Sequence, residues 1–150
     1  MASLLGLREG MKVLEIGTGC GYSAAVASYL IGPSGKLTTI ERDENLARLG
    51  RKNIDDFLRK GNLTRAVEVV HADGSGGYSA SMPFDRIYFT AGSTGDMPLE
   101  PLVRQLNECG KLLVPHQRGP LNVFNKGSPD PAQYGNYSFV PIRPGIEPVC

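Results

Sequence analysis

The sequence predicts an α/β fold built on a doubly wound, mostly parallel sheet with an antiparallel closing strand. Two observations favour this class. Short apolar runs alternate with helical segments as far as residue 114, as in a parallel sheet with helices on both faces. The composition, 41% hydrophobic and 21% charged, is typical of a globular protein. At 150 residues, the chain is expected to form a single domain over residues 1–150.

The first half of the chain alternates expected strands with expected helices. The strands are residues 12–17, 36–41 and 66–71, and the helices are residues 22–31 and 43–60. The first helix is rich in alanine and apolar nearly all round, so we expect it to pack closely on the sheet. Asp43 is a typical N-cap for the second helix, and Gly61 ends it.

The second half adds two more expected parallel strands and an edge of different character. The strands are residues 85–90 and 110–114, with a short helix at 98–106 between them. Gly, Pro and Asn become frequent after residue 119, where two further strand-like runs occur at 121–124 and 137–142. These two runs predict a β-hairpin that closes the edge of the sheet.

Charge and cysteine content exclude several classes of protein. The 16 basic and 15 acidic residues leave a net charge of +1, without the basic excess of most nucleic-acid-binding proteins. No apolar run approaches the ~20 residues of a membrane helix, and the N-terminus lacks a secretory signal, so we expect a cytoplasmic protein. The widely spaced Cys20, Cys109 and Cys150 form no CxxC motif, which predicts free thiols and no metal site.

A glycine-rich loop follows the first expected strand. It reads Glu15-Ile16-Gly17-Thr18-Gly19-Cys20-Gly21, and the next helix directs its N-terminal N–H groups at the same place. Dinucleotide-binding loops have the pattern G-x-G-x-x-G, but Tyr22 stands where their last glycine would be. The pattern G-x-G-x-G with an acid two residues before it is typical of S-adenosylmethionine binders, in which Glu15 would bind the amino group of the methionine part, directly or through water. A structural turn without a ligand is the alternative for this loop taken alone.

Two further acidic residues lie at the ends of the next two expected strands: Glu41 is the last residue of one, and Asp73 comes shortly after the other. Glu41 can accept hydrogen bonds from ribose hydroxyls, and Asp73 can accept one from an adenine amino group while the backbone N–H of Gly74 meets a ring nitrogen. Signals at three successive strand ends predict a nucleoside-type cofactor, with S-adenosylmethionine favoured over NAD. The predicted cofactor-binding residues are Glu15, Gly17, Thr18, Gly19, Gly21, Glu41, Arg42, Asp73 and Gly74.

The absence of certain motifs narrows the chemical class of the methyl acceptor. No Asn-Pro-Pro-Tyr follows the fourth expected strand, which disfavours a base-amine methyltransferase, and no Pro-Cys pair is present for a cytosine-C5 mechanism. Residues 90–93 contain no carboxylate that could take a proton from an amine. A carboxylate acceptor fits such a site, because its pKa of roughly 4 leaves it ionised at neutral pH without a general base.

Five segments together resemble the protein-L-isoaspartate (D-aspartate) O-methyltransferase family. They are LEIGTGCGYSAAV, HADGSGGY, PFDRIYFTAG, LVRQLNECGKLLVP and YSFVPI, and their order and spacing hold from Met1 to about Ile142. The resemblance implies a Rossmann-like methyltransferase fold and methyl transfer from S-adenosylmethionine to the α-carboxylate of L-isoaspartyl residues in damaged proteins, with S-adenosylhomocysteine as product. It also implies that isoaspartyl-containing proteins or peptides bind along Ser138, Phe139, Val140 and Pro141.

The family normally has further residues before the point that corresponds to Met1. They include a Thr-Ile-Ser type segment whose hydroxyl lies beside the reacting carboxylate. No catalytic residue is therefore assigned in this sequence, and we expect weak catalysis and self-association through uncovered apolar surface. The alternatives are a truncated, catalytically weak fragment that binds the cofactor, a related methyltransferase with another acceptor (a corrin precursor, tRNA or a peptide natural product), and an NAD-dependent oxidoreductase.

Overall fold

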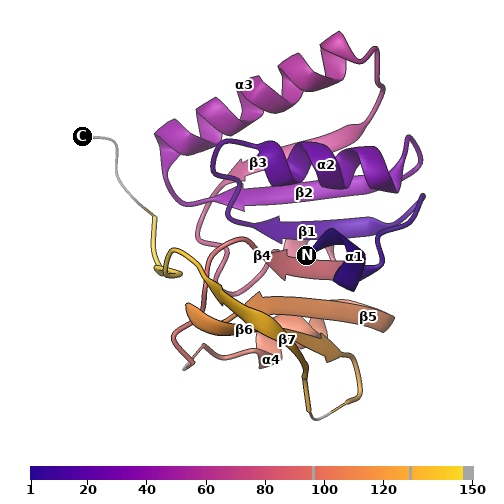
Figure 1. The fold of residues 1–150 in the computed structure, drawn as a ribbon. Helices are drawn as coiled ribbons and strands as arrows, with labels where there is room; N and C mark the ends of the chain where they lie inside the picture. The colour runs from indigo at the N-terminus through magenta and orange to yellow at the C-terminus, as the bar shows by residue number, and fades with distance from the viewer. Residues whose placement is uncertain (96, 129, 147–150) are drawn as a thin grey trace.

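The computed structural model describes residues 1–95, 97–128 and 130–146. Within them, a seven-stranded sheet has the order β3-β2-β1-β4-β5-β6-β7 (Figure 1). The strands are β1 (Lys12–Ile16), β2 (Lys36–Glu41), β3 (Ala66–His71), β4 (Phe84–Phe89), β5 (Leu106–Pro115), β6 (Arg118–Asn125) and β7 (Ala132–Ser138). The helices are α1 (Ala2–Leu5), α2 (Tyr22–Ile31), α3 (Glu44–Lys60) and α4 (Glu100–Arg104), and a short 3-10 helix, η1 (Ser79–Ser81), precedes β4.

The sheet has a parallel part and an antiparallel edge, which confirms the predicted class. Strands β3, β2, β1, β4 and β5 pair in parallel, and β6 and β7 pair antiparallel to their neighbours. The loops after β1, β2, β3 and β4 therefore meet at one edge. The strand order reverses at β1 and β4, because the chain builds outward from β1 to β3 and then returns to the other side of β1. Open α/β sheets bind ligands beside such a reversal.

Apolar side chains cover both faces of the sheet. Successive residues of a strand point to opposite faces. Val13 accordingly packs with Ala27 and Ile54 under α1, α2 and α3, whereas the next residue, Leu14, packs with Leu102 under α4. The centre of the sheet is thus buried from both sides, and its carboxyl edge is held in place by two packed layers.

The closing edge differs from the sequence prediction. Strand β7 ends at Ser138, so the predicted strand at 137–142 lies mostly beyond it. The chain leaves the sheet there because its backbone bonds to other loops: Phe139 N–H donates to Gln117 O at 2.9 Å, and Gly92 N–H donates to Val140 O at 2.7 Å. Figure 1 shows this yellow segment at the edge toward which the arrowheads of β1 and β2 point.

The short helix before β5 is also shorter than predicted. Helix α4 ends at Arg104, and β5 begins at Leu106. The reason is that Phe84 N–H donates to Gln105 O at 2.8 Å, which draws this part of the chain into the sheet.

Two further findings concern the described residues. None of their helices is both long and apolar enough to cross a membrane. Cys20 and Cys109 are exposed free thiols, as the sequence predicts for them. Cys150 lies outside the described residues.

Candidate functional site

A cavity of about 230 Å³ lies at the carboxyl edge of the parallel strands. The loops after β1, β2, β3 and β4 form most of it, and the segment after β7 forms the remaining wall. Apolar side chains such as Ile40, Leu46 and Phe89 line it beside polar groups. The predicted cofactor residues that line the cavity are Gly17, Gly19, Glu41, Arg42, Asp73 and Gly74.

The glycine loop needs glycine for two different reasons. Gly17 has a φ of 101°, and a Cβ there would lie 2.2 Å from Thr90 Oγ1. That hydroxyl donates to Gly17 O at 2.6 Å, so the loop and the end of β4 are in close contact. Gly19 has a φ of 52°, but a Cβ there would meet nothing within 4 Å. Gly17 is therefore set by packing, whereas Gly19 borders open space where a ligand can approach the backbone.

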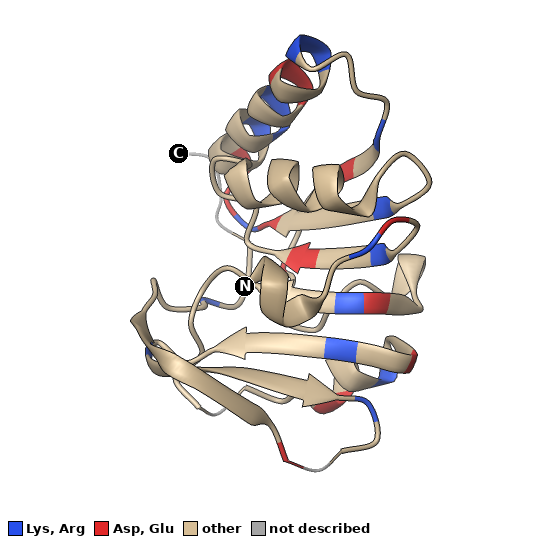
Figure 2. Cartoon of the chain, turned by 45° about the vertical axis from the view of Figure 1, so that its right-hand side comes forward, with Lys and Arg blue, Asp and Glu red and all other residues tan. Residues whose placement is uncertain are grey.

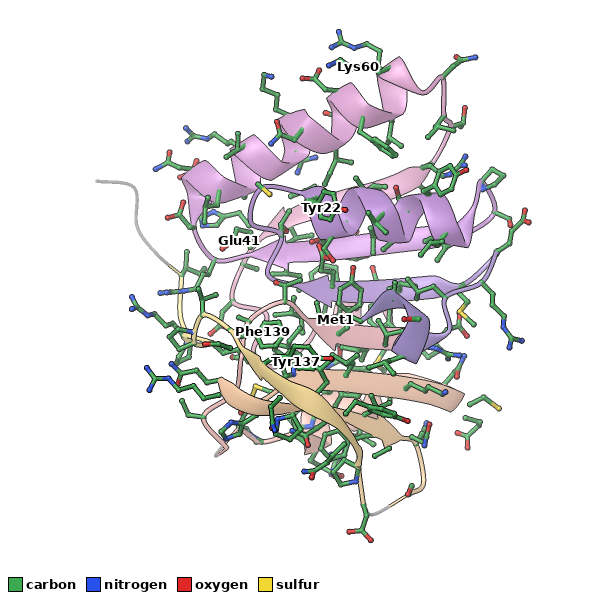
Figure 3. The ribbon with its side chains drawn as sticks, viewed as in Figure 1. Met1, Tyr22, Glu41, Lys60, Tyr137 and Phe139 are labelled. Carbon is green, nitrogen blue, oxygen red and sulfur yellow. The ribbon has the colours of Figure 1, made fainter. Side chains whose placement is uncertain are left out.

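Glu41 joins the glycine loop to the start of α3. Its side chain is nearly buried, and Figure 3 shows it at the end of β2. One carboxylate oxygen accepts from Gly19 N–H at 2.9 Å, and the other accepts from Asp43 N–H at 3.1 Å. Each carboxylate oxygen has two lone pairs, so both can still accept a further hydrogen bond from a ligand hydroxyl.

Asp73 lies in the loop after β3 and connects this loop to the segment after β7. Its two oxygens accept from Ser75 N–H at 2.9 Å and from Gly145 N–H at 2.6 Å. Burial acts to raise the pKa of Asp73, but the backbone N–H groups of Ser75 and Gly145, the Ser75 hydroxyl and the charge of Arg42 together outweigh it, and the pKa is lowered from its ordinary value. Arg42 also binds this segment, since its Nε donates to Gly145 O at 2.9 Å. The carboxylate is thus ionised and oriented at the rim of the cavity.

Three predicted cofactor residues do not line the cavity: Glu15, Thr18 and Gly21 are buried. Glu15 is completely enclosed and accepts hydrogen bonds from Thr39 at 2.7 Å and Tyr88 at 2.5 Å. Burial raises the pKa of Glu15 above its ordinary value. The reason for its position is the alternation along β1, which directs Glu15 to the face that α2 covers.

The predicted substrate residues divide between the cavity and its surroundings. Val140 and Pro141 line the cavity. Ser138 is exposed at the end of β7, and Phe139 packs against the core under α1 to α3. Figure 3 shows Phe139 close to Tyr137, and their ring centroids are 6.3 Å apart. The structure therefore brings half of this predicted group to the cavity.

Several lining residues were not predicted from the sequence. Ile142 and Arg143 directly follow the predicted substrate residues, and Leu46 lies in the first turn of α3. Their signal was weak, because Leu46 and Ile142 are isolated apolar residues that look like ordinary core and Arg143 looks like an ordinary surface residue. Thr90 and Ala91 had a clearer signal, since they follow the fourth parallel strand and so belong to the ligand-binding edge.

Comparison with protein families places this site in a known group. The family model described as Protein-L-isoaspartate(D-aspartate) O-methyltransferase (PCMT) matches residues 1–142. A protein-L-isoaspartate O-methyltransferase of Methanothrix thermoacetophila is 45% identical over 115 residues, or 77% of this chain and 51% of the relative. Protein-L-isoaspartate O-methyltransferase 2 of Archaeoglobus fulgidus is 40% identical over 148 residues, or 95% of this chain and 64% of the relative. The chain spans less than two thirds of the length of these relatives.

Solved structures give the same picture. A protein-L-isoaspartate O-methyltransferase superposes with a TM-score of 0.80 at 31% identity, over 93% of this chain and 44% of the other. A proposed protein-L-isoaspartate O-methyltransferase from Plasmodium falciparum, in complex with S-adenosyl-L-homocysteine, superposes with a TM-score of 0.76 over 94% of this chain and 70% of the other. At 22% identity, this second likeness shows the fold alone.

Proposed function

Because this chain belongs to the protein-L-isoaspartate (D-aspartate) O-methyltransferase family, we propose that it methylates the α-carboxylate of L-isoaspartyl residues in damaged proteins. The methyl ester then collapses to a succinimide, which opens a route to repair. The family match over residues 1–142 carries the proposal. It includes every segment that forms the cavity up to Ile142.

The residues of the cavity fit S-adenosylmethionine. When bound, it supplies a methyl group on a positively charged sulfur, which a carboxylate accepts without any proton transfer. We assign Glu41 to accept from the ribose hydroxyls and Asp73 with Gly74 to bind the adenine edge, and the support is that all three line the cavity. Ile40 and Phe89 supply apolar wall for the adenine ring. The backbone around Gly19 is open to the methionine part.

The role of the protein in such a reaction is mainly to orient and to exclude water. The acceptor is negative and the donor is positive, so the transition state is less charged than the reactants and is favoured in a dry, ordered site. Apolar side chains such as Ile40, Leu46 and Phe89 line the cavity beside Glu41 and Asp73, as a site that excludes water requires. We assign no general base, because an ionised carboxylate needs none at neutral pH.

We further propose that the acceptor peptide binds on the wall formed by Val140 and Pro141, with Ser138 and Phe139 beside it. The support is their position: Val140 and Pro141 line the cavity, and Phe139 and Ser138 lead back from them to the end of β7. The single-domain organisation, the cytoplasmic location, the lack of a nucleic-acid partner and the self-association expected from the sequence stay predictions.

Two measurements on the same preparation test the function. Calorimetry should show binding of S-adenosylhomocysteine and no comparable binding of NAD. Radiolabelled methyl transfer should then occur to an isoaspartyl peptide and not to the same peptide with a normal aspartyl residue. Cofactor binding without transfer would favour the alternative of a catalytically weak cofactor-binding chain. Transfer to neither peptide but to another acceptor would favour a different methyltransferase, and tighter binding of NAD would overturn both.

A further inference from the structure

A line of buried polar groups lies beneath the glycine loop, outside the cavity. Glu15 and Thr39 are completely buried, and Thr18 is only 3% exposed. Thr39 Oγ1 donates to Glu15 Oε1 at 2.7 Å, and Thr18 Oγ1 lies 2.7 Å from Thr39 Oγ1. The line therefore connects β1 to β2 and β2 to the loop.

The hydrogen positions in this line follow from counting donors. A hydroxyl has one hydrogen to donate. Thr39 uses its hydrogen on Glu15, so in the contact between the two threonines Thr18 is the donor and Thr39 is the acceptor. Both hydroxyl hydrogens consequently point toward the carboxylate of Glu15. The two oxygens of Glu15 act as acceptors from Thr39 and Tyr88, and this fixes the direction of the whole line.

Hydrogen bonds from neighbouring side chains hold Glu15 in place, and Glu15 does not line the cavity where a cofactor would bind. Its second oxygen accepts from Tyr88 OH at 2.5 Å. Among the described residues, the partners of Glu15 are hydroxyl groups and no cation forms an ion pair with it. A buried charge is costly unless its bonds are well made, so each of these hydroxyls matters to the region around it.

Thr18 carries the effect of this line to the cavity. It lies between Gly17 and Gly19, the two loop residues that line the cavity. The backbone on this loop is also held from β2, since Gly17 N–H and Thr18 N–H both donate to Ile40 O, at 2.8 and 3.1 Å. The side chain of Thr18 adds a contact from the protein interior, where a ligand cannot compete for it.

We propose that Glu15 and Thr39 are positioning residues for the cofactor: Glu15 acts through Thr39 and Thr18 to hold the glycine loop, and it does not itself bind the cofactor. This assignment rests on the proposed function, in that S-adenosylmethionine or its product is the ligand of the cavity. It gives Thr39, which the sequence analysis did not single out, a role in binding. It also gives a role to an acid at a position that the cavity does not reach.

The test compares adjacent threonines of β2. Thr39→Val removes the link to the loop while keeping the shape of the side chain, and Thr39→Ser keeps the hydroxyl. Thr38→Val is the matched control, because Thr38 is also buried and donates to a glutamate, Glu68, but does not contact the loop. For each variant, calorimetry gives the Kd of S-adenosylhomocysteine and a thermal melt gives the Tm.

Thr39→Val loses its hydrogen bonds to both Thr18 and Glu15. We expect it to weaken binding about three- to tenfold, because the bond to Thr18 is the one that holds the loop. Thr39→Ser should restore most of the affinity, and Thr38→Val should bind as the wild type even if its Tm falls equally. If Thr39→Val does not fold, Thr18→Val removes the same bond from the loop side and is judged by the same criterion.

Three results would overturn the assignment. Wild-type affinity in Thr39→Val would show that the link is dispensable. Equal losses in Thr39→Val and Thr38→Val would show a general effect on stability. Loss of binding in Glu15→Gln with full binding in Thr39→Val would make Glu15 a direct ligand. If the wild type itself does not bind S-adenosylhomocysteine, the proposed function fails, and the assignment fails with it.

Discussion

The parallel half of the sheet and its antiparallel edge build one cavity by different means. On the parallel side, buried side chains hold the loops, as Glu41 does for Gly19 and Thr39 for Thr18. On the other side, the segment after β7 is held by backbone bonds, such as that from Gly92 N–H to Val140 O. Of its side chains, Phe139 and Ile142 pack partly against the core, whereas Val140 is 72% exposed. One wall is fixed by residue identity and the other mainly by backbone geometry.

Charge is distributed in the same uneven way. Figure 2 shows charged residues along α3, where Arg48 pairs with Glu44 and Lys52 with Asp56. All seven residues of β7 are exposed, and none of them is charged. The comparison teaches that the cofactor side should tolerate few substitutions, whereas the acceptor side should tolerate many.

The largest effect is expected at Gly17. Gly17→Ala combines a φ of 101° with a Cβ that would lie 2.2 Å from Thr90 Oγ1. Strain of this kind costs about 1–3 kcal/mol of stability. We expect the affinity for S-adenosylhomocysteine to fall about a hundredfold, because strain and clash both displace the loop at the cavity.

Gly127 provides the matched control at the antiparallel edge. It also has a positive φ, 83°, but a Cβ there would meet nothing within 4 Å. Gly127→Ala should therefore lower the Tm through backbone strain alone and leave the affinity for S-adenosylhomocysteine unchanged. Similar affinity losses in the two alanine variants would contradict the division between the two walls.

The second-largest loss of affinity for S-adenosylhomocysteine is expected at Glu41. Glu41→Ala removes an acceptor from Gly19 N–H and Asp43 N–H as well as from the proposed ribose hydroxyls. Hydrogen bonds to a charged group contribute about 1.5–3 kcal/mol, so the Kd of S-adenosylhomocysteine should rise by about ten- to a hundredfold. Glu100→Ala on the exposed surface of α4 is the control and should bind normally. A Glu41→Ala variant that binds normally would remove this carboxylate from the site.

The parallel half was also the part that could be predicted from sequence. Strands β2 and β3 and helix α2 occupy the predicted ranges, because short runs rich in β-branched residues mark the two strands and Gly32 ends the helix. The positions of Glu41 and Asp73 followed from the rule that parallel strands end at one edge. Local pattern and global fold agree here.

The edge could not be predicted as well, for a physical reason. The run at 137–142 alternates like a strand, but residues after Ser138 bond to Gln117 and Gly92, which are distant in sequence. No local pattern reports such partners. The position of Glu15 outside the cavity was not predicted, for a related reason. A motif gives the residue, but the face of β1 to which its side chain points depends on the register of the strand.

A third prediction concerns the pH dependence of stability. The pKa of Glu15 is raised by burial, so the folded protein binds this proton more tightly than the unfolded chain does. Stability is therefore lost as the pH rises from the ordinary value of 4.5 through the raised pKa. Glu15→Gln has no such group. The free energy of unfolding of the variant, relative to the wild type, should rise with pH over this window.

Urea titrations at several pH values check this point. The difference between the two proteins isolates Glu15, because other titrating groups such as Asp73 contribute to both. Asp73 has the opposite sign: its lowered pKa makes it stabilising above its ordinary value of 3.8 and less so as the pH falls. A difference that is flat with pH would show that Glu15 titrates alike in the folded and unfolded states.

The smallest effect is expected on the acceptor wall. Val140→Ala removes apolar surface that is mostly exposed, and a partly buried side chain of this size contributes less than the ~0.8 kcal/mol of each fully buried methylene. We expect the Kd of an isoaspartyl peptide, measured with saturating S-adenosylhomocysteine, to rise about threefold. The affinity for S-adenosylhomocysteine itself should change less than that for the peptide. Tyr29→Ala, an exposed aromatic on α2, is the control and should alter neither. A loss of cofactor affinity larger than the loss of peptide affinity would place Val140 on the cofactor side, and the two walls would then not be separable in function.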